Sequence, residues 1–144
     1  MEMTNMQADM ILTQLSTIYA SLTKNSEPAP CVLTVGLAKN IRKMQGELKE
    51  YFEEKTKLLQ KYEITSDAQI SDSQNENGQR FLAEFNPLCV EDSGVELHKI
   101  RMTFDELCDV MENYSGAMIG DPMILQLICK DESENKDEDQ KEGE

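Results

Sequence analysis

Three carboxylates after Thr103 have a spacing that could serve acid–base chemistry. Asp105, Asp109 and Glu112 stand at positions i, i+4 and i+7, which places all three on one face of a helix. Paired carboxylates can act as general acid and general base, but catalysis also requires a nucleophile or a substrate-positioning group nearby. The sequence offers neither beside them. We therefore interpret this face as a solvated polar face that can contact a partner.

The single histidine, His98, is the other candidate for proton transfer. It is closely followed by Lys99 and Arg101, but no nucleophile can be identified for it. The chain also contains no nucleophile elbow, no phosphate-binding glycine loop and no H-E-x-x-H motif. The sequence thus predicts a non-enzymatic protein with no catalytic residue and no cofactor.

Metal ligation is also not expected. The four cysteines are far apart and none forms a C-x-x-C pair, so a zinc site would have to draw ligands from four separate elements. They are Cys31, Cys89, Cys108 and Cys129. We predict reduced, buried thiols. The stretch from Ser73 to Glu84 imitates part of a calcium loop, but it lacks the first aspartate.

The charge of the chain is strongly negative and unevenly distributed. The formal net charge of the 144 residues is −14, with +3 over residues 32–62, −9 over 63–130 and −6 over 131–144. Such an excess of acid disfavours direct binding of nucleic acid. No signal peptide and no apolar run long enough for a membrane span are found, so a cytoplasmic protein without membrane contact is expected.

The basic residues of 32–62 include a cluster on the predicted second helix. Lys39, Arg42 and Lys43 lie away from its apolar stripe. We interpret them as ordinary surface charge, balanced by nearby glutamates through i,i+4 pairs. These glutamates are Glu47, Glu50, Glu53 and Glu54.

Hydrophobic periodicity predicts two N-terminal helices. The first covers residues 4–22 and the second covers residues 32–63. The second carries an apolar stripe with alternating four- and three-residue steps. A stripe with this spacing typically packs against another helix. The stripe consists of Leu37, Ile41, Met44, Leu48, Tyr51, Lys55, Leu58 and Tyr62. Residues 1–64 are therefore expected to form a helical hairpin with coiled-coil character.

The remainder is expected to be a polar linker over residues 65–79, a small C-terminal part over 80–130 and a disordered acidic tail over 131–144. In the small part we predict a helix over 79–86 that Pro87 ends, a strand over 95–102, and a helix opened by a capping box of Thr103 and Glu106. Residues 122–129 fit either a short helix or a buried strand. The predicted class is mainly α with minor β: the hairpin plus a compact part with short helices and one or two short strands.

The first helix is too short to pack against the far end of the stripe within the hairpin. This end includes Lys55, Leu58, Leu59 and Tyr62. Either the small C-terminal part folds back onto this end, or a partner docks there.

Residues 33–63, followed by VELHKIRMTFDELCDVM at 95–111, resemble a group of small uncharacterised phage and prophage proteins. In that group a helical hairpin precedes a short compact part. Glu63 and Ile64 depart from the pattern, because the group tends to have a glycine there. The resemblance implies a phage origin and an accessory role in the cytoplasm of the host cell.

The leading hypothesis is an acidic phage accessory protein that binds a protein partner, such as a host nuclease or defence complex, and inhibits it in the manner of anti-CRISPR or anti-restriction proteins. The alternative is a phage structural or assembly protein that forms homo-oligomers through its hairpin. The candidate partner-binding residues are Glu91, Asp92, Asp105, Asp109, Glu112, Leu58, Leu59 and Tyr62.

Overall fold

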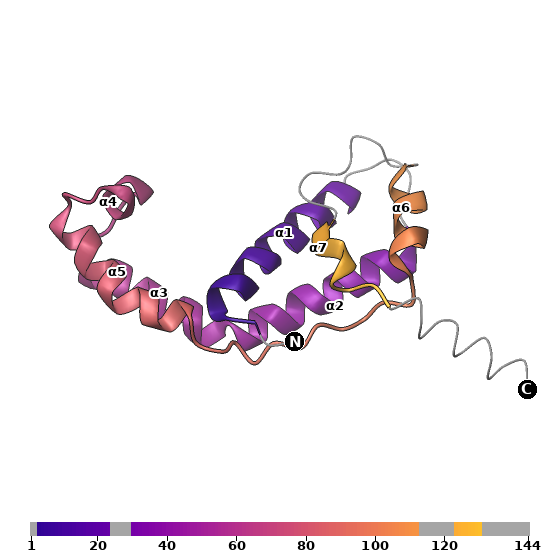
Figure 1. Cartoon of the computed structure of the whole chain (residues 1–144), viewed down its shortest axis with the longest axis horizontal. Coiled ribbons are helices and arrows are strands. Elements are labelled where there is room, and N and C mark those ends of the chain that lie inside the picture. Colours follow the sequence, from indigo (N-terminus) through magenta and orange to yellow (C-terminus); the bar gives the residue numbers. More distant parts are fainter. Residues whose placement is uncertain (1–2, 24–29, 113–122, 131–144) are drawn as a thin grey trace, which may run out of the picture. The chain divides into compact units, whose positions relative to one another are not determined.

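The computed structural model describes residues 3–23, 30–112 and 123–130. Within these ranges the chain is mainly helical, as predicted (Figure 1). The helices are α1 (Asn5–Thr23), α2 (Cys31–Glu47), α3 (Lys49–Lys61), α4 (Asp67–Ser71), α5 (Glu76–Cys89), α6 (Phe104–Glu112) and α7 (Met123–Gln126). The expected short strands are absent from the described residues, which contain only two isolated β-bridges, Thr4 to Asp92 and Ile100 to Cys129.

The chain divides into two compact units. The first unit combines Met1–Met10 with Met44–Val95, and the second combines Ile11–Lys43 with Glu96–Glu144. Each unit thus joins segments that are distant in the sequence. This division does not follow the boundary expected near residue 65.

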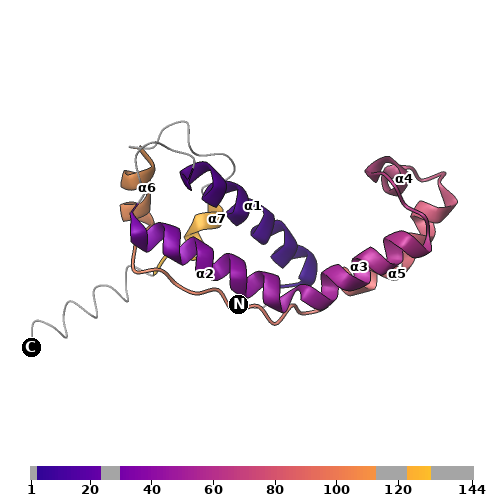
Figure 2. The same cartoon turned by 180° about the vertical axis from the view of Figure 1, so that it is seen from behind.

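Helices α3 and α5 lie side by side in the first unit, and α4 contacts α5 (Figure 2). Three aromatic rings pack together here: Phe81 and Phe85 of α5 stack with centroids 5.0 Å apart, and the ring of Tyr51 on α3 lies 5.7 Å from that of Phe85. Phe81 is only 1% exposed. The start of the chain completes this core, because the amide of Asn5 donates to the carbonyl of Glu91 over 2.9 Å.

The far end of the stripe is contacted by α5 and is half-buried there. The ammonium of Lys55 lies 5.6 Å from the ring centroid of Phe85. The Glu84 carboxylate accepts hydrogen bonds from Lys61 at 2.9 Å and from the Tyr62 hydroxyl at 2.8 Å. These contacts tie the last turn of α3 to the middle of α5.

The expected polar linker over residues 65–79 is wrong, because this range contains α4 and the start of α5. The side chain of Gln69 accepts from the amides of Thr65 and Ser66, which closes the first turn of α4. The side chain of Asn75 accepts from the amide of Gly78 over 2.9 Å and caps α5. At Gly78 the carbonyl of Gln69 occupies the space of a Cβ atom, so only glycine allows α4 so close.

Helix α5 is also longer than predicted at its other end, and Pro87 lies inside it. Proline lacks the amide that would bond to the carbonyl of Ala83, so a single hydrogen bond is lost. Pro87 is in the last turn, and the helix ends at Cys89 with Val90 as its C-cap. The expectation that Pro87 ends the helix is therefore wrong by one turn.

The predicted helix over 32–63 is observed as α2 and α3, interrupted only at Leu48. The interruption follows Gly46, whose intrinsic helix propensity is about 1 kcal/mol poorer than that of alanine. Helix α3 ends in a Schellman motif: the amide of Ile64 donates to the carbonyl of Leu59, and the amide of Glu63 to that of Gln60. Glu63 has a φ of 53°, a conformation that favours glycine.

The second unit is organised around the segment of residues 96–103, which lies in extended form against α2. Ile100 packs so close to Gly36 that a Cβ atom there would collide with its side chain. The amide of Ile100 donates to the carbonyl of Ile128 over 2.7 Å, and the amide of Lys130 donates to the carbonyl of Met102 over 3.1 Å. The predicted strand over 95–102 is thus reduced to a single parallel bridge.

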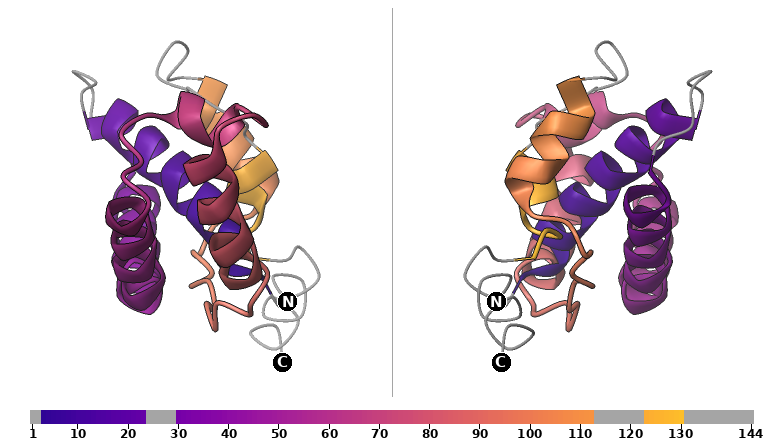
Figure 3. Two further views of the ribbon diagram at one scale, coloured as in Figure 1. Left: turned by 90° about the vertical axis from the view of Figure 1, so that its left-hand side faces the viewer. Right: turned by 90° about the vertical axis from the view of Figure 1, so that its right-hand side faces the viewer.

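Residues 122–129, which fitted either a short helix or a buried strand, contain a short helix followed by a β-bridge. Helix α7 occupies Met123–Gln126, and Cys129 then forms the bridge to Ile100. Figure 3 shows α7 (yellow) and α6 (orange) from two further sides. The core of this unit is aliphatic and includes Leu15, Ile18, Leu22, Leu33, Leu37, Ile100, Leu107, Leu125 and Ile128.

The local predictions for α1 and for the start of α6 hold. Helix α1 covers the expected range to within one residue. The capping box before α6 is formed, because the Thr103 hydroxyl accepts from the amide of Glu106 at 3.2 Å and the Glu106 carboxylate accepts from the amide of Thr103 at 3.4 Å. The tail expected over 131–144 lies outside the described residues.

Candidate interaction surfaces

A buried asparagine organises the surface of the second unit. Asn40 is 0% exposed on α2. Its amide nitrogen donates to the carbonyls of Gly36 and His98, both at 2.9 Å, and its side-chain oxygen accepts from the amide of His98 at 2.7 Å. The side chain therefore bonds both backbone groups of His98, which fixes the segment 96–103 on the helix.

Exposed basic side chains are present both on α2 and on the segment that Asn40 holds. Lys39 and Lys43 stand on α2 on either side of Asn40 in the sequence, and His98 is the residue that Asn40 holds. We define the basic surface as the exposed residues Lys39, Arg42, Lys43, His98, Lys99 and Arg101. Within the described part of the chain, none of these six forms an ion pair.

The expected balance of Lys39, Arg42 and Lys43 by glutamates is therefore not observed among the described residues. The three ion pairs found there are Lys57 with Glu54, Lys61 with Glu84 and Arg80 with Glu76, and all belong to the first unit. Lys99 is the member of the basic surface with a hydrogen bond, to the carbonyl of Leu127 at 2.9 Å. The positive charge of this surface is left to solvent or to a partner.

The first unit carries the opposite charge at the end of α2. A Cβ atom added at Gly94 would lie 3.7 Å from the Glu47 carboxylate, so the turn at 91–94 is next to this glutamate. Glu91 and Asp92 on that turn are exposed, and Glu50 is exposed one helical turn after Glu47. We define the acidic surface as Glu47, Glu50, Glu91 and Asp92. None of these four forms an ion pair with any residue that the structure describes.

The candidate partner-binding residues are divided between the two units. Glu91 and Asp92 are exposed in the first unit, whereas Asp105 and Asp109 are exposed on α6 in the second. Leu58, Leu59 and Tyr62 are half-buried on α3, which α5 lies alongside. The side chain of Glu112 lies outside the described residues.

A buried polar contact joins three segments of the first unit. The Tyr51 hydroxyl, on a side chain that is 4% exposed, donates to the Asp9 carboxylate over 3.1 Å. Burial, and then the negative charge of Asp9, raise the pKa of Tyr51. Burial also raises the pKa of the neighbouring Cys89 thiol. Both groups therefore stay protonated at neutral pH and act as structural contacts rather than as nucleophiles.

The cysteines are divided between core and surface. Cys89 and Cys129 are buried as predicted, but Cys31 and Cys108 are exposed, which corrects the expectation that all four are buried. Burial raises the pKa of the Cys129 thiol to about 11. All four are free thiols. Among the described residues, no group of three or more His, Cys, Asp or Glu side chains is arranged to hold a metal ion.

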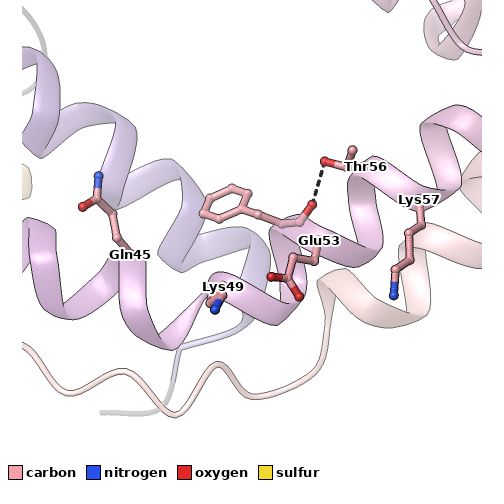
Figure 4. A pocket seen from close by; sticks show the side chains of 6 residues that line it. Gln45, Lys49, Glu53, Thr56 and Lys57 are labelled. Carbon is pink, nitrogen blue, oxygen red and sulfur yellow. Dashed lines mark hydrogen bonds between the residues drawn. The ribbon is translucent and has the colours of Figure 1, made fainter.

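An open depression of about 460 Å³ lies on one face of α2 and α3 (Figure 4). Its one aromatic residue is Phe52, and charged side chains from Lys49, Glu53 and Lys57 line its border. The hydroxyl of Thr56 is turned into the helix and donates to the carbonyl of Phe52 over 3.0 Å. The depression lacks a convergent set of polar groups of the kind that orients a small molecule.

The chain matches no protein-family model, no curated protein and no solved structure in the comparisons with known proteins. The resemblance to phage proteins therefore stays a prediction. None of the described helices is both long enough and apolar enough to cross a membrane.

Proposed function

We propose that this protein is a non-enzymatic binding protein that contacts a protein partner through the acidic surface of its first unit. The charge of that unit supports the proposal: its described residues include twelve Asp or Glu side chains and five Lys or Arg side chains. The exposed carboxylates of Glu47, Glu50, Glu91 and Asp92, which form no ion pair among the described residues, supply negative charge around the turn at 91–94. Such a region attracts a basic partner and speeds its association.

The partner that fits this chemistry is a protein with a positively charged groove. The nucleic-acid groove of a nuclease has this property, and an acidic protein seated in it excludes the phosphate backbone. The resemblance to phage proteins favours a host nuclease or defence complex as the target. The activity proposed is therefore inhibition of the anti-CRISPR or anti-restriction type.

The test compares two charge variants of the full chain. The first changes Glu50→Gln, Glu91→Gln and Asp92→Asn on the acidic surface. The second is a matched control that changes Glu53→Gln, Glu63→Gln and Asp67→Asn, which are also exposed residues of the first unit. Each variant loses three negative charges, so a general effect of net charge is equal in both.

We expect affinity capture from host lysate to recover a nuclease or defence component with the unaltered chain and with the control. The acidic-surface variant should bind the same component at least about tenfold more weakly, equivalent to about 1.4 kcal/mol. Equal loss in both variants would show that only overall charge matters. Capture without any nuclease, polymerase or defence component would contradict the proposal.

A second candidate function is self-assembly through the N-terminal helices, arranged as the predicted hairpin of residues 1–64. It is favoured by two exposed methionines one turn apart on α1: Met6 is 54% exposed and Met10 is 62% exposed. Large apolar side chains in such positions can bury themselves against a second copy. Light scattering at increasing concentration tests this, with Met6→Gln and Met10→Gln as the disrupting variant. A strictly monomeric chain would remove this candidate.

A further inference from the structure

The open depression on α2 and α3 has the spacing of a helix-packing face. It is lined at steps of four, three and four residues by Gln45, Lys49, Phe52 and Thr56. Such steps place side chains on one face of a helix, where they can pack against another helix. The ring of Phe52 is half-buried, and the other three side chains are exposed. Helix α5 packs against α3 through a different side chain, Tyr51, so the face with Phe52 is left open.

This face is continuous across the interruption at Leu48. The amide of Leu48 donates to the carbonyl of Met44, and the amide of Phe52 donates to the carbonyl of Leu48, both over 2.9 Å. Helical hydrogen bonding therefore continues from α2 into α3. The eleven steps from Gln45 to Thr56 correspond to a face about 17 Å long.

Two opposite charges lie beside the Phe52 ring on this face. Lys49 and Glu53 are exposed one helical turn apart on the border of the depression (Figure 4), and neither forms an ion pair with a residue that the structure describes. With the base before the acid, an i,i+4 pair has the less favourable orientation within a helix. The third charge on the border differs, because the ammonium of Lys57 pairs with Glu54 at 3.2 Å. Lys49 and Glu53 are therefore available to charges on another molecule.

A second copy of the same face presents these charges in the matching order. In an antiparallel pair of helices with a two-fold axis at the level of Tyr51, Lys49 of each copy faces Glu53 of the other. Phe52 is one residue from that axis, so the two rings are about 3 Å apart along the helices and can stack. Gln45 then faces Thr56 of the second copy. The Thr56 hydroxyl donates to the carbonyl of Phe52 over 3.0 Å, which leaves its oxygen free to accept from a Gln45 amide.

The other register, in which Glu53 faces Lys57, fits less well. Its two-fold axis lies at the level of Lys55, which separates the two Phe52 rings by about 9 Å along the helices and removes their contact. It also competes with the ion pair that Lys57 already forms with Glu54. The pairing of Lys49 with Glu53 is therefore the favoured register.

The local charge also permits a second copy to approach. Residues 44–62 contain four Lys and four Glu side chains and no other charged residue, whereas the whole chain has a net charge of −14. Two copies that meet through this segment do not bring a local excess of acid together. A strongly basic partner, in contrast, gains nothing from a neutral face. The charge balance thus favours a second copy as the occupant.

We propose that the face of Gln45, Lys49, Phe52, Glu53 and Thr56 binds the same face of a second copy in an antiparallel two-fold dimer. A contact of this length is small beside standard protein interfaces, so the dimer is weak and forms as the concentration rises. The proposal does not rest on the binding of a basic partner through the acidic surface. It also uses residues other than Met6 and Met10 of α1.

Sedimentation velocity of the full chain tests the proposal over concentrations from about 10 μM to about 1 mM, where weak contacts form and dissociate. Lys49→Glu and Glu53→Lys each place like charges opposite one another, and each should weaken the dimer at least about tenfold. Both changes together restore opposite charges in reverse order, so the double variant should return to within about threefold of the unaltered chain. Its net charge equals that of the unaltered chain, which separates pairing from overall charge. Lys57→Glu is the matched control for Lys49→Glu and should leave the dimer unchanged.

The charge variants keep the proposal falsifiable without changing Phe52, because they alter only exposed side chains. A chain that stays monomeric at about 1 mM, a double variant that does not recover, or equal weakening by Lys57→Glu and Lys49→Glu would overturn the proposal. So would a dimer that survives Lys49→Glu and is lost with Met6→Gln and Met10→Gln, since it would assign self-association to α1. None of these results depends on whether the acidic surface captures a basic partner, so the two proposals fail separately.

Discussion

The two units differ in charge and in the way each holds its long-range contacts. The first unit is acidic and is closed by aromatic packing between α3 and α5, where the ring centroids of Tyr51 and Phe85 are 5.7 Å apart. The second unit is nearly balanced in its described residues and is closed by the amide clamp of Asn40 on His98. Aromatic packing can accommodate charged side chains at its edge. The buried Asn40 amide, in contrast, is stabilising only while both of its hydrogen bonds to the His98 backbone are formed. The difference predicts that the two units respond differently to substitution.

Removal of the central ring should have the largest effect, and it should be concentrated in the first unit. Phe81→Ala creates a cavity in the aromatic core and is expected to lower the free energy of unfolding by about 3–5 kcal/mol. Each unit contains one buried cysteine, Cys89 in the first and Cys129 in the second, which report local opening. Thiol labelling should accelerate more at Cys89 than at Cys129. Equal acceleration would mean that the units unfold together.

Loss of the clamp should be the next largest effect. Asn40→Ala leaves the amide and the carbonyl of His98 without their partner, at an expected cost of about 2–4 kcal/mol. Amide hydrogen exchange should rise over residues 98–102 and remain unchanged at α5. Asn40→Asp is the matched control, since it keeps the acceptor for the His98 amide but has no donor for the carbonyl. If Asn40→Ala unfolds no more easily than the unaltered chain, the clamp does not stabilise this unit.

Two glycines of α2 should respond in opposite directions. Gly36→Ala places a methyl group against the buried side chain of Ile100, with an expected loss of about 1–2 kcal/mol after the gain in helix propensity. At Gly46 no atom lies within 4 Å of an added Cβ atom, so Gly46→Ala should stabilise by about 0.5–1 kcal/mol. Denaturant unfolding of both variants gives the comparison. Two changes of the same sign would contradict the close contact at Gly36.

The end of α3 should also accept a stabilising change. Glu63 adopts a φ of 53° in the Schellman motif, a conformation that costs about 1 kcal/mol for a residue with a Cβ atom. Glu63→Gly removes this cost, and we expect a gain of about 0.5–1 kcal/mol in thermal or denaturant unfolding. Gly94 provides the reference for such a conformation, with a φ of 71°. A loss of stability would show that the carboxylate of Glu63 has a role of its own.

The smallest effect concerns the acid range. Hydrogen bonds from Lys61 and then Tyr62 hold the pKa of Glu84 below its usual value of 4.5. A depressed pKa in the folded state stabilises above the unfolded pKa, and this contribution is lost as the pH falls below about 4.5 and through the folded value. Glu84→Gln should therefore flatten the pH dependence of unfolding in this range. Because the pair is exposed, the change should be small and reduced by salt.

Predictions that rest on neighbouring residues hold best. The capping box of Thr103 and Glu106 and the bounds of α1 follow from hydroxyl, carboxylate and apolar groups within a few positions of each other. The start of α5 also had a local signal, Asn75 three residues before Gly78, but the polar composition of 65–79 concealed it. The polar composition of this range predicted a loop. Helices form instead, because the side chains of Gln69 and Asn75 accept hydrogen bonds from the backbone amides of their first turns.

The functional surfaces were not predictable in this way. The sequence identified Lys39, Arg42 and Lys43 as a cluster and His98 as a histidine without a nucleophile, but nothing connected His98 with the cluster. Asn40 and His98 are 58 residues apart, and a polar residue within an apolar helix pattern does not name its partner. For the same reason Glu47 could not be placed beside Gly94.

By itself the sequence determined that the chain is mainly helical, where its apolar stripe lies, and that its charge is −14. Helix periodicity and capping depend on side chains a few positions apart, so they can be read along the chain. Only the tertiary structure decided that α5 contacts the far end of the stripe, that the cysteines divide between core and surface, and that Asn40 of α2 holds the backbone of His98. These contacts depend on shape and burial between distant segments, and periodicity carries no information about which distant faces meet.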